Sequence, residues 1–428
     1  MKLLSFTTDF NDIIGLIFSL LYFYQVLYLA VSLLRRRGEQ QPARPGRLRR
    51  YAALISARNE EAVIGQLIAS LKAQDYPAEL LDIYVVADNC TDDTAGAAQR
   101  AGATVFRRFD RTRVGKGYAL DHLLKTLEKE GKGEDYEGYF IFDADNIVDP
   151  AFVREMNKTF GEGDWAAVTG YRNSKNFGDN WISAAYSIWF LREARFLNTA
   201  RQALGLTCHV SGTGFLLSAR EVRENGGWPF HLLTEDIEFS ARCAVAGKKI
   251  GYCDKAVIYD EQPTSFRQSW DQRLRWSKGF FQVCGKYGPD LLRGIFRGGR
   301  RGAGCYDVLM LVAPGVILTL LGGAANLAVL GSCLLVTDLE AKFILVAFVG
   351  TLGKWLGSFY GGMLLLGVLT VASEWDRIRA KPWQKVVWLP LFPVFMLTYI
   401  PNTVCALFRK VEWKPIAHRA LGSMDQAA

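Results

Sequence analysis

Four apolar side chains run directly into two carboxylates in the stretch Tyr139-Phe140-Ile141-Phe142-Asp143-Ala144-Asp145-Asn146. A short apolar run of this kind is typical of a buried strand. Side chains alternate along a strand, so Asp143 and Asp145 point to the same side if the extended geometry continues. Open parallel sheets bind ligands at their carboxyl edge, where Mg²⁺ or Mn²⁺ takes one or two carboxylates together with phosphate oxygens. The stretch therefore indicates a metal–diphosphate site, with a solvated turn as the alternative.

The sequence around this stretch alternates between strand and helix patterns. Before it, the pattern predicts strands at 51–56, 82–87 and 104–106, and helices at 61–74 and 118–130. After Pro150 it predicts strands at 166–169, 249–252 and 256–259, and a glycine-bracketed loop at 210–217 that feeds a strand. It also predicts helices at 180–202 and 234–246, the latter with Thr234 as its N-cap. Such alternation predicts an α/β domain with a doubly wound, mostly parallel sheet.

Four apolar segments are long enough to cross a bilayer. The first, 13–34, is followed by Arg35-Arg36-Arg37 and by no cleavage site, so we expect a retained anchor. The others lie at 308–336, 343–372 and 386–408, and prolines 390, 393 and 401 could break the last one. The expected order is an anchor at 1–34, a basic linker at 35–50, a catalytic domain at 51–262, amphipathic helices at 263–302, transmembrane helices at 303–410 and a tail at 411–428.

The basic residues flank these apolar segments. The net charge is +8, and the arginines gather at 35–50 and 293–301. This placement favours membrane lipids over nucleic acid as the anionic partner and predicts a multi-pass protein of the cell membrane with a cytosolic catalytic domain. The side of the C-terminal tail stays open. The stretch 265–296 is expected to lie in the membrane interface, with ordinary surface helices as the alternative. Eight cysteines without a C-x-x-C pair are expected to be reduced.

Four motifs stand in order along the chain: Asp88, Asp143/Asp145, Thr234-Glu235-Asp236 and Gln272-Arg273-Leu274-Arg275-Trp276. This order resembles the D, DxD, TED and QxxRW motifs of membrane-integrated family 2 glycosyltransferases, which include cellulose, chitin, hyaluronan and poly-N-acetylglucosamine synthases. The resemblance covers about residues 50–290. It implies a GT-A-type domain, a UDP-sugar donor and Mg²⁺ or Mn²⁺ as cofactor.

The resemblance also assigns residues to the donor. Asp145 is the expected metal ligand, with Asp143 supporting the metal, ribose or phosphate, and Arg275 pairs with the diphosphate. Asp88 is expected to contact the uridine, although Ala87 replaces the aspartate that usually precedes it. Three further positions resemble donor-binding residues, with a first-turn capping acid as the alternative for Glu60 and a solvated turn for Lys116: Ala57, Asn59-Glu60 and Lys116.

On the acceptor side, the resemblance makes Asp236 the general base, which requires hydrogen-bond reach to the acceptor hydroxyl. A helix start would lower its pKa, so its surroundings must compensate; simple helix capping is the alternative for this motif. Trp276 resembles a residue that stacks on the acceptor sugar, and a membrane-interface anchor is the alternative. The other expected acceptor-binding residues are Ser211, Gly212, Thr213, Glu235 and Gln272.

Together these features predict an inverting, metal-dependent transferase that uses a UDP-sugar on the cytosolic face. The favoured interpretation is a processive synthase of a β-linked polysaccharide. The alternative is an enzyme that adds one or a few sugars to a membrane lipid, for which we expect a groove opening sideways into the bilayer. A transporter or scaffold is disfavoured, because Lys354 is the only charge within the last three segments. The sequence does not specify the sugar or any accessory subunit.

Overall fold

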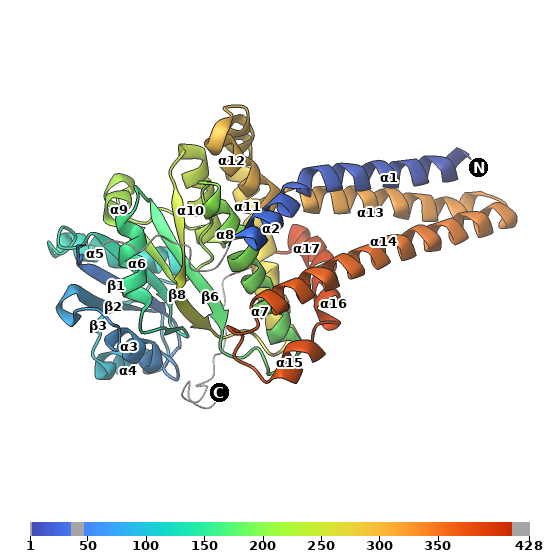
Figure 1. The fold of residues 1–428 in the computed structure, drawn as a ribbon. Helices are drawn as coiled ribbons and strands as arrows, with labels where there is room; N and C mark the ends of the chain where they lie inside the picture. The colour runs from blue at the N-terminus through green and yellow to red at the C-terminus, as the bar shows by residue number, and fades with distance from the viewer. Residues whose placement is uncertain (1, 36–46, 413–428) are drawn as a thin grey trace.

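The computed structural model describes residues 2–35 and 47–412, and it shows a sheet domain at one end and long helices at the other (Figure 1). Most of the predicted basic linker and of the C-terminal tail lies outside these residues. Short 3₁₀ turns are found at Ala78–Leu80 and Cys333–Leu335. All eight cysteines are free, as expected.

The sheet has eight strands in the order β3-β2-β1-β4-β7-β6-β8-β5. The strands β3, β2, β1 and β4 are parallel to one another, and β7 runs antiparallel between β4 and β6. The predicted mostly parallel α/β sheet is therefore confirmed. The strands are β1 (Tyr51–Ala57), β2 (Leu81–Asp88), β3 (Thr104–Arg108), β4 (Gly138–Asp143), β5 (Ile147–Val148), β6 (Ala167–Ser174), β7 (Phe215–Ser218) and β8 (Ile250–Asp260).

Helices cover both faces of this sheet. Along β4, Tyr139 and Ile141 pack into the core on one face, and Phe140 and Phe142 pack into the core on the other, as the alternation of strand side chains requires. The second core is closed by α3 (Ile64–Lys72), α4 (Thr94–Ala101) and α6 (Phe152–Gly161). The first is closed by α5 (Lys116–Lys129), α7 (Trp181–Arg192), α9 (Ala219–Asn225) and α10 (Glu235–Ala246).

Two predicted elements differ from the structure. The long helix expected at 180–202 is interrupted, because α7 passes into a π-helical segment, Glu193–Asn198, before α8 (Thr199–Ala203). The two strands expected at 249–252 and 256–259 form the single strand β8, since a register shift opposite Gly170/Tyr171 absorbs the residues between them.

The stretch expected to lie in the membrane interface forms one helix of 30 residues, α11 (Phe266–Ile295). It packs against α10, against α12 (Gly299–Val312) and against α17 (Tyr399–Phe408). Helix α11 is therefore enclosed between the sheet domain and the C-terminal helices. Its contact with a bilayer stays a prediction.

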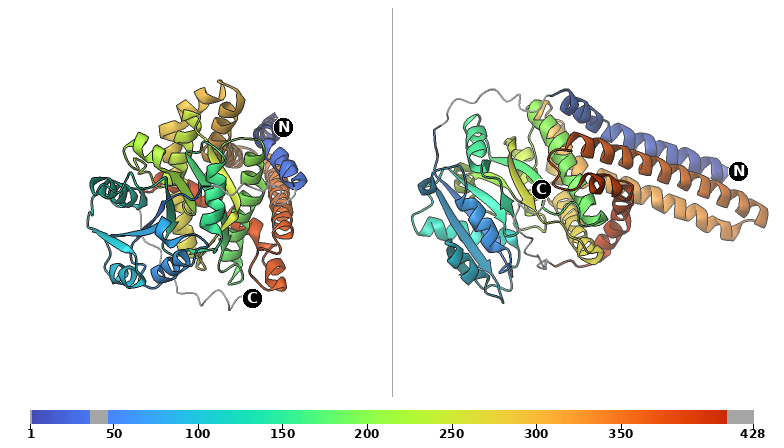
Figure 2. Two further views of the ribbon diagram at one scale, coloured as in Figure 1. Left: turned by 60° about the vertical axis from the view of Figure 1, so that its left-hand side comes forward. Right: turned by 60° about the horizontal axis from the view of Figure 1, so that its bottom comes forward.

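Four helical stretches are long and apolar enough to cross a membrane: Asp9–Leu34, Ile317–Leu335, Asp338–Ser373 and Leu391–Phe408. Figures 1 and 2 show α1, α13 and α14 side by side, extending away from the sheet. The expected number of spans is confirmed, but the second begins later than predicted, because the chain breaks at Ala313 before Pro314. The last segment is broken before Leu391, at Pro390, and again at Thr398, whereas Pro393 lies within α16. The helices are α1 (Lys2–Tyr22), α2 (Tyr24–Leu34), α13 (Pro314–Ser332), α14 (Asp338–Ser373), α15 (Pro382–Val387), α16 (Leu391–Leu397) and α17.

Candidate active site

One cavity of about 540 Å³ extends from the carboxyl edge of the sheet to the membrane helices. It brings together most residues predicted for the site, although they are far apart in sequence. The predicted residues that line it are Glu60, Asp88, Lys116, Asp143, Asp145, Ser211, Gly212, Glu235, Asp236, Gln272, Arg275 and Trp276. Three others, Ala57, Asn59 and Thr213, are not among the described residues that line it.

Strand β4 ends at Asp143, and Asp145 lies in the turn that follows, so the extended geometry assumed for this pair does not continue. The Asp143 carboxylate accepts a hydrogen bond from Lys116 Nζ, which also donates to the Gly212 carbonyl at 2.6 Å. Burial alone would lower the pKa of Lys116, but Asp143, Glu235 and Asp236 raise it, so the lysine stays charged. The Thr213 hydroxyl accepts a hydrogen bond from Asp143 N at 2.9 Å. Thr213 therefore supports the aspartate turn from behind the cavity wall.

Asp143 and Asp145 have the donor atoms that a hard divalent cation prefers. Within the described residues, no group of three or more His, Cys, Asp and Glu side chains gathers to hold an ion. Asp145 is 4% exposed, and its Oδ2 accepts a hydrogen bond from Glu261 N at 3.3 Å. The pair therefore fits a cation that obtains its remaining ligands from a bound diphosphate.

A buried ion pair that the sequence did not indicate lies beside these aspartates. Arg172 Nε on β6 donates to Asp260 Oδ2 at the end of β8 at 2.8 Å, and Arg172 Nη1 donates to the Ser211 carbonyl at 2.8 Å. Asp260 Oδ1 also accepts from Asn146 Nδ2 at 3.1 Å. Burial would lower the pKa of Arg172, but Asp260, Asp143 and Asp145 raise it. No motif marks these residues, and only the order of the strands brings them together.

The predicted base lies in the first turn of α10. Burial raises the pKa of Asp236, and the Ile237 N–H, Lys116 and Arg172 offset this only in part. The lowering expected from the helix start is thus outweighed. Burial and the adjacent Asp236 raise the pKa of Glu235 to about 7. A carboxylate whose pKa lies above the ordinary value is better suited to accept a proton near neutral pH.

Thr234 occupies the N-cap position of α10, but its hydroxyl makes no capping hydrogen bond. A Cβ built on Gly279 of α11 would meet the Thr234 side chain at 2.5 Å, so the two helices are in close contact there. Thr234 is therefore the N-cap residue, as predicted, but its side chain packs against α11 and does not cap the helix.

The end of the cavity that the sequence predicts to bind the donor contains Asp88 at the end of β2. Its Oδ1 accepts hydrogen bonds from Arg108 Nη1 at 2.5 Å and from Asn89 Nδ2 at 3.0 Å. Glu60 lines the cavity nearby. Asn59 has a left-handed φ of 59°, and its Oδ1 accepts a hydrogen bond from Thr91 N at 2.8 Å, which holds the loop after β1.

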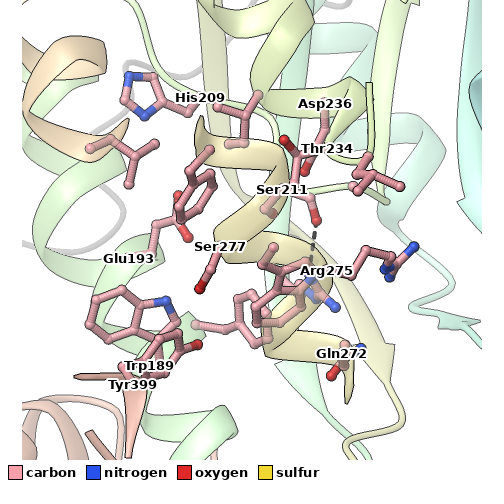
Figure 3. A pocket seen from close by; sticks show the side chains of 18 of the residues that line it. Trp189, Glu193, His209, Ser211, Thr234, Asp236, Gln272, Arg275, Ser277 and Tyr399 are labelled. Carbon is pink, nitrogen blue, oxygen red and sulfur yellow. Dashed lines mark hydrogen bonds between the residues drawn. The ribbon is translucent and has the colours of Figure 1, made fainter. Parts of the chain in front are cut away.

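Helix α11 supplies one wall of the cavity through Gln272, Arg275 and Trp276, which share a helix face. The Arg275 guanidinium makes no hydrogen bond to another residue of the described ranges, so it can pair with an anion. Trp276 makes edge contacts with Tyr186 and Phe190 at centroid distances of 5.7 and 6.1 Å. These contacts hold the indole in the cavity wall. Figure 3 shows Gln272 and Arg275 of the same helix.

The other half of the cavity was not predicted. Arg201 forms two hydrogen bonds with Asp307, at 2.6 and 3.0 Å, and the hydroxyls of Tyr24 and Tyr28 each donate to the same carboxylate at 3.2 Å. This network ties the N-terminal span to α8 and α12. Beyond it the cavity wall is mostly apolar, and the membrane helices contribute Phe18, Leu320, Phe359 and Ile400 to it.

Comparisons with known proteins agree with this geometry. Residues 49–279 match the model of a family described as "Glycosyltransferase like family 2". A β-monoglucosyldiacylglycerol synthase of Synechocystis sp. is 26% identical over 54% of this chain and 47% of its own length. A poly-β-1,6-N-acetyl-D-glucosamine synthase of Staphylococcus epidermidis is 23% identical over 54% of each chain. The matched region thus covers about half of each of these relatives.

The fold is also found among solved structures. A mannosyltransferase from Pyrobaculum calidifontis, solved with GDP-Man and Mn²⁺, superposes with a TM-score of 0.56 at 17% identity, over 92% of this chain and 99% of that one. That protein has the GT-A fold, so the expected fold class is confirmed. The family model covers more than half of the 428 residues, and this protein is a glycosyltransferase that belongs to family 2.

Proposed function

We propose that the protein transfers a sugar from a UDP-sugar to an acceptor lipid that enters the cavity from the bilayer. The observation that carries this proposal is the continuity of the cavity. The same space is lined by Asp143, Asp145 and Asp236 and by the apolar residues Leu320 and Phe359 of the membrane helices. An acceptor with an apolar tail can therefore present its hydroxyl to the base while the tail stays among apolar side chains.

The proposed reaction is a single inverting displacement. The acceptor oxygen forms a bond to the anomeric carbon as the bond from that carbon to the diphosphate breaks. Asp236 takes the proton of the acceptor hydroxyl, and the diphosphate leaves with the electron pair. Arg275 and Lys116 are placed to stabilise the charge that develops on it. A divalent cation held by Asp143 and Asp145 would neutralise further charge on the leaving group.

The identity of the donor and the orientation in the membrane rest on sequence patterns. The UDP preference comes from the family motifs, and Asp88 with Glu60 offers the expected position for the nucleoside. The arginines that follow the first span favour a cytosolic catalytic domain.

A processive polysaccharide synthase is the second candidate, because relatives of similar identity make poly-N-acetylglucosamine. A closed exit channel for a polymer would require the spans to face one another through polar and aromatic side chains. The membrane helices instead line the cavity in part with apolar side chains, among them Leu320, Phe359 and Ile400. This lining favours an acceptor with an apolar tail.

The test is to incubate the purified protein in detergent with radiolabelled UDP-sugars, GDP-mannose as a comparison donor, and a membrane lipid extract. We expect label from one UDP-sugar to move into an organic-soluble product of low mass. Label in a water-soluble polymer of high mass would instead support the polysaccharide synthase. A reaction with a large excess of unlabelled UDP serves as the inhibited control.

A further inference from the structure

The α7 helix ends at a carboxylate to which the family motifs assign no role. Glu193 is the first residue of the π-helical segment Glu193–Asn198 and lines the cavity. Figure 3 shows its side chain on the same cavity as those of Ser277 and Asp236. Single π-helical turns are rare and often occur at functional sites. Glu193 thus lines the same cavity as the predicted base.

The arginines near Glu193 are already engaged with other groups. Arg192 Nη2 donates to Gln25 Oε1 at 2.5 Å, Arg201 is bound to Asp307, and Arg172 is bound to Asp260. No hydrogen bond or ion pair joins the Glu193 carboxylate to another side chain in 2–35 or 47–412. Burial raises the pKa of Glu193, and the charges of Arg201, Arg192 and Arg172 offset this only in part. A carboxylate in such a place is costly unless a donor reaches it.

A second polar side chain in the same part of the cavity also lacks a partner. His209 is 1% exposed and lines the cavity, and its Nε2 has no hydrogen-bond partner among the described residues. Burial and the nearby Arg201 lower the pKa of His209 to about 3, so the ring is neutral. The Glu193 carboxylate and His209 Nε2 therefore both lack a hydrogen-bond partner among the described residues, and an apolar lipid tail could not supply one.

We propose that Glu193 binds a hydroxyl of the acceptor other than the one that reacts, so that the acceptor carries a sugar or another polyol headgroup. The proposal rests on the proposed function and narrows its substrate class. A lipid with a single hydroxyl, such as diacylglycerol, would present that hydroxyl to Asp236 and leave Glu193 without a donor. A glycolipid presents several hydroxyls next to the reacting one. Sites built to bind a substrate hydroxyl strongly reject analogues that lack it.

The test compares acceptors in the full-length protein held in lipid nanodiscs. The acceptors are diacylglycerol, monoglucosyldiacylglycerol and a free disaccharide, each with the UDP-sugar that wild type uses. We expect wild type to favour the glycolipid over diacylglycerol by at least about tenfold in kcat/KM. In Glu193→Gln we expect kcat/KM for the glycolipid to fall about tenfold, because the KM for the acceptor rises while the KM for the donor is unchanged. Glu128→Gln, the same change at an exposed position of α5, is the matched control.

Each outcome has a distinct meaning. Equal use of diacylglycerol and glycolipid by wild type, or an unchanged acceptor KM in Glu193→Gln, overturns the role of Glu193 but leaves lipid glycosylation intact. If wild type prefers the free disaccharide, the acceptor must still be a polyol, but it is not a lipid.

If wild type makes no lipid product, the proposed function fails, and binding still decides the role of Glu193. The binding of octyl glucoside, below its micellar concentration, would then be compared with that of octanol by tryptophan fluorescence, to which Trp189 and Trp276 of the cavity wall contribute. Tighter binding of the glucoside than of octanol in wild type, and its loss in Glu193→Gln, supports the proposal. Equal binding of the glucoside by both proteins overturns it.

Discussion

At the sheet end of the cavity, the carboxylates of Asp88, Asp143 and Asp260 each have a cation bonded to them, namely Arg108, Lys116 and Arg172. At the membrane end, Glu193 is surrounded by arginines whose hydrogen bonds go to other groups. A donor end with charges already in place suits a ligand that is always the same, a nucleoside diphosphate. At the proposed acceptor end, the Glu193 carboxylate and His209 Nε2 have no hydrogen-bond partner among the described residues, so the acceptor would complete the site.

The largest expected effect is at the point where the two ends meet. Asp236→Asn keeps the shape of the side chain and removes the group that accepts the proton, so we expect turnover to fall about a thousandfold. UDP binding, measured by calorimetry, should change little, because the donor end is untouched. Turnover close to that of wild type would show that Asp236 is not the base.

The donor end should depend on a cation. We expect chelation of divalent ions to reduce transfer at least about a hundredfold, and added Mg²⁺ or Mn²⁺ to restore it. Asp145→Asn should lower activity to a similar extent and raise the concentration of metal needed for half-maximal rate. Full activity in the presence of chelator would reject the metal role of Asp145.

Substitutions at the membrane end of the cavity should change the KM for the acceptor and not the KM for the donor. Leu320 lines the cavity, whereas its neighbour Leu321 is 52% exposed on the outer side of α13. We expect Leu320→Gln to raise the acceptor KM about tenfold, because a polar group replaces part of the apolar wall, and to leave the donor KM unchanged. Leu321→Gln is the control, since it places the same polar group on the same helix outside the cavity. Equal effects of the two changes would point to helix insertion and not to acceptor binding.

The smallest expected effect is a shift of the pH profile. Asp236 works as a base only when it is deprotonated, so activity is lost as pH falls through its pKa. Because burial raises this pKa, the acid limb of kcat/KM should lie at higher pH than an ordinary aspartate would give. Lys116 lowers the pKa of Asp236, so Lys116→Gln should move the acid limb to still higher pH. An acid limb that stays in place, whatever the loss of rate, would contradict this coupling.

Much of the donor end could be predicted from the sequence. The apolar run before Asp143 is a local signal for a buried strand, so the position of this residue at the strand end needed no tertiary information. Asp145 lies in the turn after the strand, where alternation along the strand no longer applies. The pKa of Asp236 could not be predicted in this way. A helix start alone lowers it, and the burial that outweighs this effect comes from segments distant in the chain.

The proposed acceptor end of the cavity could be predicted from the sequence even less. Glu193 is one acid within a predicted helix, and nothing in its neighbours indicates a π-helical turn or a cavity. Arg201 and Asp307 are 106 residues apart, and Tyr28 comes from the first span. Such contacts depend on how the spans pack against the sheet domain, which periodicity within one segment does not encode.

The sequence by itself determined the alternating sheet, the four apolar spans and the order of the motifs, because strand and helix periodicity and hydropathy are properties of neighbouring residues. Only the tertiary structure decided that Asp260, Arg172 and Glu193 share one cavity with these motifs, and that this cavity continues between the membrane helices. The physical reason is that a cavity is formed by side chains that meet across elements. Its shape depends on packing between segments that are separated by hundreds of residues.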